Sequence, residues 1–170
     1  LPNQAQSGNK EKNMQWQQGA YVISTNKSQL DIPLIYDYLS NSYWSKGIPR
    51  KTLEAAISDA MCFGLYDTSN DNCSVNGQKS PAQIGFARVI TDNATFAYLA
   101  DVFILEQHQG EGLGKWLMKC VFAHPSLQGL RRMMLATADA HGLYQQSGFT
   151  ALKIPERFME LHDPDVYKNR

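Results

Sequence analysis

The sequence is poor in cysteine, and the three cysteines it contains form no recognisable pattern. Cys62, Cys73 and Cys120 lie far apart and lack the spacing of metal ligands. An odd set of this kind favours free thiols in a reducing compartment over a disulfide framework. The N-terminus also lacks the charged start and apolar centre of a signal peptide. We therefore expect a cytoplasmic protein with no bound metal.

Neither sign of charge is in excess, and long apolar runs are absent. The 170 residues include 16 Lys and Arg and 16 Asp and Glu, which gives a formal net charge of zero. This balance argues against a nucleic-acid-binding surface and against a basic membrane-binding face. No apolar run reaches the roughly 18 residues that a membrane-spanning helix requires. We expect neither nucleic acid nor a membrane as a partner.

The length fits one folded domain whose core needs no disulfide. Residues 1–19 are rich in Gln, Asn and Lys and predict a flexible polar arm. Residues 20–170 contain no internal repeat and no linker that would divide them. They are expected to form a single domain.

Apolar residues recur with strand and helix periods along this domain. Asp31 is expected to cap a first helix, a second runs from about Pro49 to Ala60, and His124-Pro125 ends a third. A short fourth helix, capped by Asp139, is expected over Ala140–Ser147, and a long mobile connection over 67–81. The expected strands are Tyr21–Ser24, Met61–Tyr66, Gln83–Ile90, Thr95–Leu105, Met133–Ala138, Phe149–Leu152 and Phe158–Leu161.

One stretch joins an apolar strand to a helix through Gly110, Gly112 and Gly114. Such a loop offers bare backbone and an unpaired helix start to an anion, which is typical of a phosphate site. Lys115 stands where a dinucleotide motif has its third glycine. Gln109 replaces the first glycine of a triphosphate loop, so both common motifs fail. From the glycines alone, a simple tight turn is an equal alternative.

Two segments resemble the GNAT superfamily of N-acetyltransferases. Gln109-x-x-Gly112-x-Gly114 resembles its [Q/R]-x-x-G-x-[G/A] signature, and Tyr144-x-x-x-Gly148-Phe149 resembles its Y-x-x-x-G-F segment. The resemblance covers roughly residues 21–161, and both motifs occur in the family's order. It implies an α/β fold with a mixed, mostly antiparallel central sheet flanked by helices. It further implies that this sheet is splayed between its fourth and fifth strands.

The resemblance also implies acetyl-CoA as co-substrate and direct attack by a primary amine in a ternary complex. The pyrophosphate would lie on the glycine loop and the pantetheine arm along the central strand. A backbone N–H near Phe103 or Ile104 would polarise the thioester carbonyl. A sensor of acyl-CoA without turnover is the alternative. The implied coenzyme-binding set is Phe103, Ile104, Gln109, Gly110, Glu111, Gly112, Leu113, Gly114, Lys115, Thr137 and Tyr144.

Two catalytic candidates follow. The resemblance implies that Tyr144 returns a proton to the leaving thiolate, although a half-buried tyrosine bonded to backbone is the alternative. Asp101 is the only acid within the apolar central strand, so burial makes it a candidate base. A carboxylate at a strand bulge is the other interpretation. His141 could carry a proton, but it falls in the first turn of a helix, where positive charge is disfavoured, so packing or a hydrogen bond to the backbone is expected.

The acceptor site is less well marked. Tyr43 and Trp44 lie in the loop between the first two helices, and Arg88 lies on the third expected strand. Loops on a rigid scaffold often carry binding residues, so these three are candidate acceptor contacts. The two aromatic residues could instead fill the edge of the core. We expect a small-molecule amine acceptor, and exposed late strands could pair two copies as a homodimer.

Overall fold

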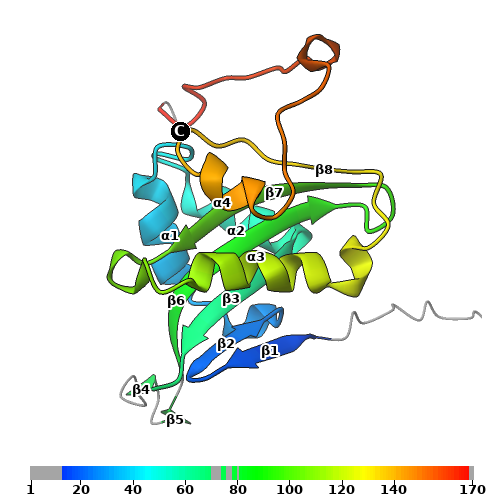
Figure 1. The fold of residues 1–170 in the computed structure, drawn as a ribbon. Coiled ribbons are helices and arrows are strands. Elements are labelled where there is room, and N and C mark those ends of the chain that lie inside the picture. Colours follow the sequence, from blue (N-terminus) through cyan, green and yellow to red (C-terminus); the bar gives the residue numbers. More distant parts are fainter. Residues whose placement is uncertain (1–12, 70–73, 76–77, 80, 169–170) are drawn as a thin grey trace, which may run out of the picture.

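The computed structural model describes residues 13–69, 74–75, 78–79 and 81–168 as an open sheet with helices on both faces (Figure 1). The six strands lie in the order β1-β2-β3-β6-β7-β8, and only the pairing of β7 with β8 is parallel. The expected mixed, mostly antiparallel sheet is therefore confirmed. The strands are β1 (Gln15–Gln18), β2 (Tyr21–Ser24), β3 (Met61–Asp67), β6 (Ala82–Thr91), β7 (Phe96–Ile104) and β8 (Arg132–Met134).

The remaining elements lie between or after these strands. A two-stranded hairpin of β4 (Ser74–Val75) and β5 (Gln78–Lys79) lies within the expected 67–81 connection, of which residues 70–73, 76–77 and 80 lie outside the described residues. The α-helices are α1 (Ile32–Asn41), α2 (Arg50–Asp59), α3 (Leu113–Ala123) and α4 (His141–Gln145). The 3-10 turns are η1 (Lys27–Gln29), η2 (Glu106–His108), η3 (Pro125–Leu127) and η4 (Pro155–Arg157). In the described part of the chain, no helix has the length and apolarity to cross a membrane.

The helix ends follow local sequence signals. The Asp31 side chain accepts a hydrogen bond of 3.0 Å from the Leu34 N–H, with Pro33 in the first turn, so α1 begins where expected. α3 ends at His124, directly before Pro125, because proline disfavours helical geometry in the residue that precedes it.

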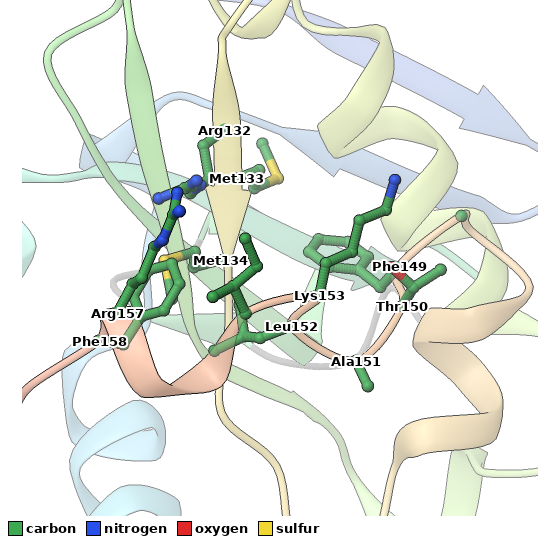
Figure 2. Close-up of a pocket in the computed structure, with 12 residues that line it drawn as sticks. Arg132, Met133, Met134, Phe149, Thr150, Ala151, Leu152, Lys153, Arg157 and Phe158 are labelled. Atoms are coloured by element: carbon green, nitrogen blue, oxygen red, sulfur yellow. The ribbon is translucent and has the colours of Figure 1, made fainter.

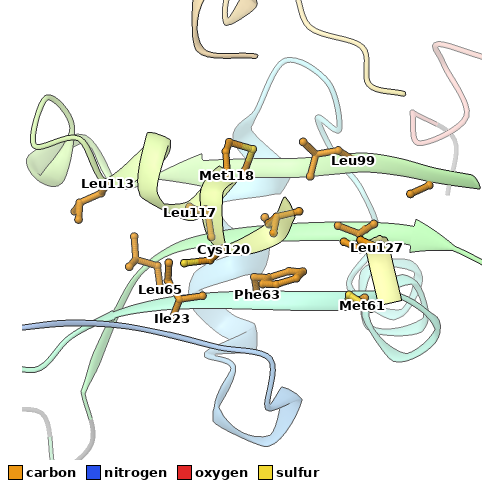
Figure 3. Packing of buried hydrophobic residues seen from close by; sticks show 14 of the residues in the cluster. Ile23, Met61, Phe63, Leu65, Leu99, Leu113, Leu117, Met118, Cys120 and Leu127 are labelled. Atoms are coloured by element: carbon orange, nitrogen blue, oxygen red, sulfur yellow. The ribbon is translucent and has the colours of Figure 1, made fainter. Parts of the chain in front are cut away.

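The sheet separates two apolar clusters. One lies between the sheet and α3 and includes Phe63, Leu117 and Met118 (Figure 3). The other lies between the sheet, α1 and α2, and includes Leu39 and Leu53. Strand β3 supplies both clusters, because successive side chains of a strand point to opposite faces. The sheet is therefore held from both sides.

Residues 15–18 belong to the sheet, although the sequence placed them in a flexible polar arm. Strand β1 pairs with β2 over its whole length. Its Trp16 ring packs at 6.0 Å from the ring of Phe63, across the edge of the α3 cluster. The Trp16 side chain thus provides the apolar contact that holds β1 on the sheet, which its polar neighbours cannot provide.

The late part of the chain differs most from expectation. Strand β8 ends at Met134 instead of Ala138, and neither 149–152 nor 158–161 forms a strand. Pro155 begins the turn η4 between these two segments. The side chains of Met159 and Leu161 are 98% and 105% exposed, so they contribute nothing to the core. Strand propensity alone does not form a strand where no sheet edge pairs with it.

Candidate active site

The glycine loop leads into the start of α3 through two left-handed residues. Gly110 has a φ of +84° and Gly112 a φ of +80°, a region that disfavours every residue with a side chain. The first backbone bond within α3 runs from the Trp116 N–H to the Gly112 carbonyl at 3.1 Å. Among the described residues, no acceptor is paired with the N–H groups of Leu113–Lys115. This is the geometry of an anion-binding helix start.

Two side chains fasten this loop to the sheet. Gln109 donates through Nε2 to the Ile104 carbonyl at 2.9 Å, so the loop is tied to the end of β7. The Glu111 carboxylate accepts a 2.5 Å hydrogen bond from the Tyr21 hydroxyl, and this bond raises the pKa of Tyr21. Both contacts hold the helix start in place without using its free N–H groups.

Strands β7 and β8 are joined at one end only. They pair over three positions, Phe96–Tyr98 with Arg132–Met134, and then diverge. The rest of β7 therefore has one edge without a strand partner among the described residues. The expected splay between these two strands is confirmed.

Beside this gap, β7 carries a bulge at Asp101. The residue has a φ of +54°, and one extra residue lies in β7 between the pairs Phe86–Phe103 and Arg88–Ala100. Such a bulge resets which side chains face each side of a sheet. Val102 and Ile104 consequently pack against the α3 cluster and Phe103 against the opposite cluster.

Beyond the bulge, the main-chain hydrogen bonds of β7 point alternately toward β6 and toward the gap. This alternation distinguishes Phe103 from Ile104 as the residue whose N–H could polarise the thioester. The Leu105 N–H donates to the Ile84 carbonyl at 2.8 Å, so the main chain of Leu105 faces β6. Because antiparallel ladders alternate, the main chain of Ile104 then faces the gap. The bond of its carbonyl to Gln109 agrees with this orientation. The main chain of Phe103 faces β6, so the geometry favours Ile104.

Both oxygens of the Asp101 carboxylate are engaged. Oδ2 accepts from Arg88 Nε at 2.6 Å, and Oδ1 accepts from Trp44 Nε1 at 3.2 Å. The side chains of Arg88 and Asp101 are only 15% and 9% exposed. Asp101 thus lies at a strand bulge, as one of the two interpretations expected, and joins two of the three candidate acceptor contacts.

Tyr144 lies in α4 with its ring packed edge-on against Phe149 at 6.0 Å. Burial, together with the nearby Tyr43 and Asp139, raises its pKa to about 12. Its hydroxyl makes no hydrogen bond to any residue that the structure describes. A protonated hydroxyl with a free donor is what protonation of a leaving group requires.

Thr137 and His141 lie close to Tyr144. All three line a pocket of about 310 Å³ that β8 and residues 149–152 also border. The Thr137 hydroxyl accepts from the Ala140 N–H at 3.0 Å and so stabilises the start of α4. Asp139 was expected to cap this helix, and that prediction is wrong, because the N-cap residue is Ala140 and no side chain caps the helix. The His141 side chain is exposed, so of the two expected alternatives, packing or a backbone bond, packing is wrong.

Tyr43 connects two segments that are far apart in the sequence. Its hydroxyl donates to Asp139 Oδ1 at 3.3 Å and accepts from the Ala138 N–H at 3.1 Å. Tyr43 is 58% exposed and Trp44 41% exposed, so neither fills the core edge. Asp139 is therefore a site residue that the sequence analysis missed, since an acid before a helix is more often a cap.

A second pocket, of about 500 Å³, lies at the outer edge of β8. Figure 2 shows Met133 and Met134 on one side and residues of the segment 149–158 around them. The Arg132 guanidinium lies 4.9 Å from the Phe158 ring centre. This space lies where the late strands were expected, and none of its lining residues belongs to the expected coenzyme set.

The described residues offer no activated cysteine and no group of metal ligands. Cys62 and Cys120 are buried free thiols, and burial raises the pKa of each to about 11. Both are therefore protonated and inert at neutral pH. Over residues 13–69 and 81–168, no three His, Cys, Asp or Glu side chains are grouped as metal ligands.

Comparison with known proteins identifies the family. The family model described as "Acetyltransferase (GNAT) domain" matches residues 75–151, which include the glycine loop and Tyr144. A Gibberella zeae protein assigned as an acetyltransferase is 35% identical over 144 residues, covering 78% of this chain and 80% of that protein.

Solved structures agree. A Xanthomonas campestris pv. campestris protein assigned to the GNAT family is 47% identical with a TM-score of 0.77, covering 88% of this chain and 97% of the other. N-acetylglutamate synthase from Neisseria gonorrhoeae, solved with coenzyme A and N-acetylglutamate, shares the fold at 20% identity and a TM-score of 0.54, covering 77% of this chain and 28% of that one. On these grounds the chain belongs to the GNAT acetyltransferase family.

Proposed function

We propose that this protein moves the acetyl group of acetyl-CoA to the primary amine of a small molecule in a ternary complex. The observation that carries the proposal is the free start of α3 beside the unpaired edge of β7. A pyrophosphate fits the N–H groups of Gly110–Lys115, because they combine unpaired donors with the positive end of a helix dipole. The bound coenzyme A in the Neisseria structure supports the same donor.

The pantetheine arm then follows the free edge of β7. Its amides can pair with main-chain groups that face the gap, and the Ile104 N–H, which faces the gap, would donate to the thioester oxygen. A positioned donor at this atom stabilises the negative charge that forms during attack. Binding both substrates in one site supplies the proximity that the reaction needs.

Proton transfer completes the chemistry. The neutral amine nitrogen bonds to the carbonyl carbon, the carbon–sulfur bond breaks, and the thiolate takes a proton from Tyr144. The attacking nitrogen then gives up its surplus proton, which restores the Tyr144 hydroxyl. The raised pKa keeps the Tyr144 hydroxyl protonated at neutral pH. The incoming ammonium must first lose a proton. Asp139 is exposed, whereas the oxygens of Asp101 already hold Arg88 and Trp44, so we assign this proton to Asp139 and a positioning role to Asp101.

Tyr144→Phe separates the enzyme from a coenzyme sensor of the same fold. Removing the general acid should slow acetyl transfer by about 100-fold while leaving the dissociation constant of acetyl-CoA almost unchanged. Thiol release with a panel of primary amines measures the first quantity, and calorimetry measures the second. A parent protein that binds acetyl-CoA but acetylates no amine would support the sensor. Equal turnover by parent and variant would remove Tyr144 from the mechanism.

We also propose that the protein works in the cytoplasm as a homodimer. Two buried free thiols are typical of a reducing compartment. The nearly full exposure of Met159 and Leu161 and the position of β8 at the end of the sheet support pairing with a second copy. Light scattering of the purified protein should give twice the monomer mass, and a monomer at micromolar concentration would contradict this.

A further inference from the structure

We infer that the acceptor is an amine cation with an apolar body and no carboxylate, held by the aromatic and acidic residues around Tyr43 and Trp44. This inference rests on the proposed function and narrows its substrate class. We call the set the acceptor cluster. It consists of Tyr38, Tyr43, Trp44, Asp101, Phe103, Glu106 and Asp139.

Four rings of the cluster form a continuous row. Phe103 of β7 stacks on Tyr38 with ring centres 3.9 Å apart and planes 12° from parallel. The ring centre of Trp44 lies 6.4 Å from that of Tyr38. The ring centre of Tyr43 lies 5.0 Å from that of Trp44, and these two rings meet edge-on. The row runs from a buried ring at the bulged strand to half-exposed rings at the surface. It offers apolar ring surface and ring faces to a ligand.

The loop that carries Tyr43 and Trp44 is held rigidly. The hydroxyls of Ser42 and Ser45 are buried, and both donate to the Leu39 carbonyl, at 2.7 and 2.8 Å. The outer ends of the two aromatic side chains are also fixed, Tyr43 to Asp139 and Trp44 to Asp101. A preformed wall of this kind costs little ordering entropy when a ligand binds.

Acids surround the row. Burial raises the pKa of Tyr38, and the nearby charges of Glu106 and Asp139 raise it further. Asp139 acts on Tyr144 in the same direction. The Tyr38 and Tyr144 hydroxyls therefore both experience a negative potential, and Asp139 contacts the Tyr43 hydroxyl directly. A cation is attracted to carboxylates and to aromatic faces alike.

The basic side chain that contacts the cluster is already paired with a carboxylate. Among the described residues, Arg88 is the one basic side chain for which a contact to the cluster is recorded, and its Nε is bound to Asp101 at 2.6 Å. A zwitterionic amino acid would bring its carboxylate beside Asp139 and Glu106 without a partner. Specificity of this kind arises from repulsion as much as from attraction.

Three ligands with one shared body test this inference. We would titrate 2-phenylethylamine, phenylalanine amide and phenylalanine into the protein saturated with coenzyme A, and measure each dissociation constant by calorimetry. The amine and the amide should bind at least about tenfold more tightly than phenylalanine, because like charges in a partly buried site repel strongly. Binding is measured without acetyl transfer, so the outcome does not depend on turnover.

Substitutions test which residues bind the amine. Asp139→Asn should weaken binding of 2-phenylethylamine about fivefold and Trp44→Leu by a similar factor. Asp59→Asn, which removes an exposed acid at the end of α2, should change nothing. Circular dichroism checks that each variant is folded.

Three outcomes would overturn the inference. They are phenylalanine binding as tightly as the amine, none of the three compounds binding, and Asp59→Asn weakening the amine as much as Asp139→Asn. If only the proposed function is wrong, the amine still binds more tightly than phenylalanine, but acetyl-CoA is not consumed.

Discussion

The two halves of the proposed site differ in the groups that form them. The donor half consists of main-chain groups, namely the N–H groups at the start of α3 and the free edge of β7. The acceptor half consists of side chains, such as Tyr43 and Asp139, that lie 96 positions apart in the sequence. A main-chain site tolerates many side chains and depends on conformation, whereas a side-chain site changes with each substitution.

The largest effect should come from breaking the conformation of the donor half. Gly112→Glu forces a side chain into a left-handed position and adds negative charge at the pyrophosphate site. We expect acetyl-CoA affinity to fall about 100-fold or more, measured by calorimetry. Gly129→Glu is a matched control, since Gly129 has a φ of +71° and open space around it but lies outside the loop. Similar losses in both variants would contradict the site.

A smaller effect is expected from the acceptor half. Asp139→Asn should lower kcat/KM for amines about 20-fold near neutral pH, because the ammonium loses its proton acceptor. The loss should shrink as the pH approaches the amine's own pKa, where the substrate is already neutral. A pH-rate profile of parent and variant measures this. A loss that stays constant with pH would assign Asp139 to binding alone.

The ion pair at the bulge links the two halves. Arg88→Gln and Asp101→Asn should each lower acetyl transfer about tenfold and stability by about 2 kcal/mol, because each leaves a mostly buried charge unpaired. Chemical denaturation and thiol release measure the two quantities. If Asp101 were the base, Arg88→Gln would keep the carboxylate and most of the rate. That result would reject the positioning role.

A change outside both halves should alter stability only. The Tyr66 hydroxyl is buried without a hydrogen-bond partner among the described residues, and burial raises its pKa. Tyr66→Phe removes this group and should raise the free energy of unfolding by about 1 kcal/mol, with acetyl transfer unchanged. The Tyr66 contribution to pH dependence has a definite sign. As the pH rises from the ordinary tyrosine pKa, near 10, toward the raised value, the free energy of unfolding falls, because the unfolded state loses the proton more easily. Tyr66→Phe should not show this fall.

Much of the fold could be predicted because its signals are local. Asp31, Pro33 and His124-Pro125 mark helix ends through the chemistry of neighbouring backbone. The expected central strand, Thr95–Leu105, differs from β7 by one residue at each end, because its apolar run is continuous. These features need no knowledge of distant contacts.

The remainder depends on contacts between distant segments. β1 forms because Trp16 reaches Phe63, which polar neighbours in the sequence do not indicate. The late strands are missing because 149–152 and 158–161 do not pair with β8, although it is the last strand of the described sheet. In the site, the glycine loop could be predicted from the spacing of Gln109, Gly112 and Gly114. The pairing of Arg88 with Asp101 and of Tyr43 with Asp139 arises only after the chain has folded.

The most direct test of the central claim is amide hydrogen exchange with and without coenzyme A. We expect slower exchange at Gly110–Lys115 and at Ile104, because their N–H groups would acquire acceptors on the ligand. Residues around the pocket at the outer edge of β8, including Arg132 and Lys153, should exchange at unchanged rates. Protection around that pocket, with the start of α3 unaffected, would contradict the main-chain donor site.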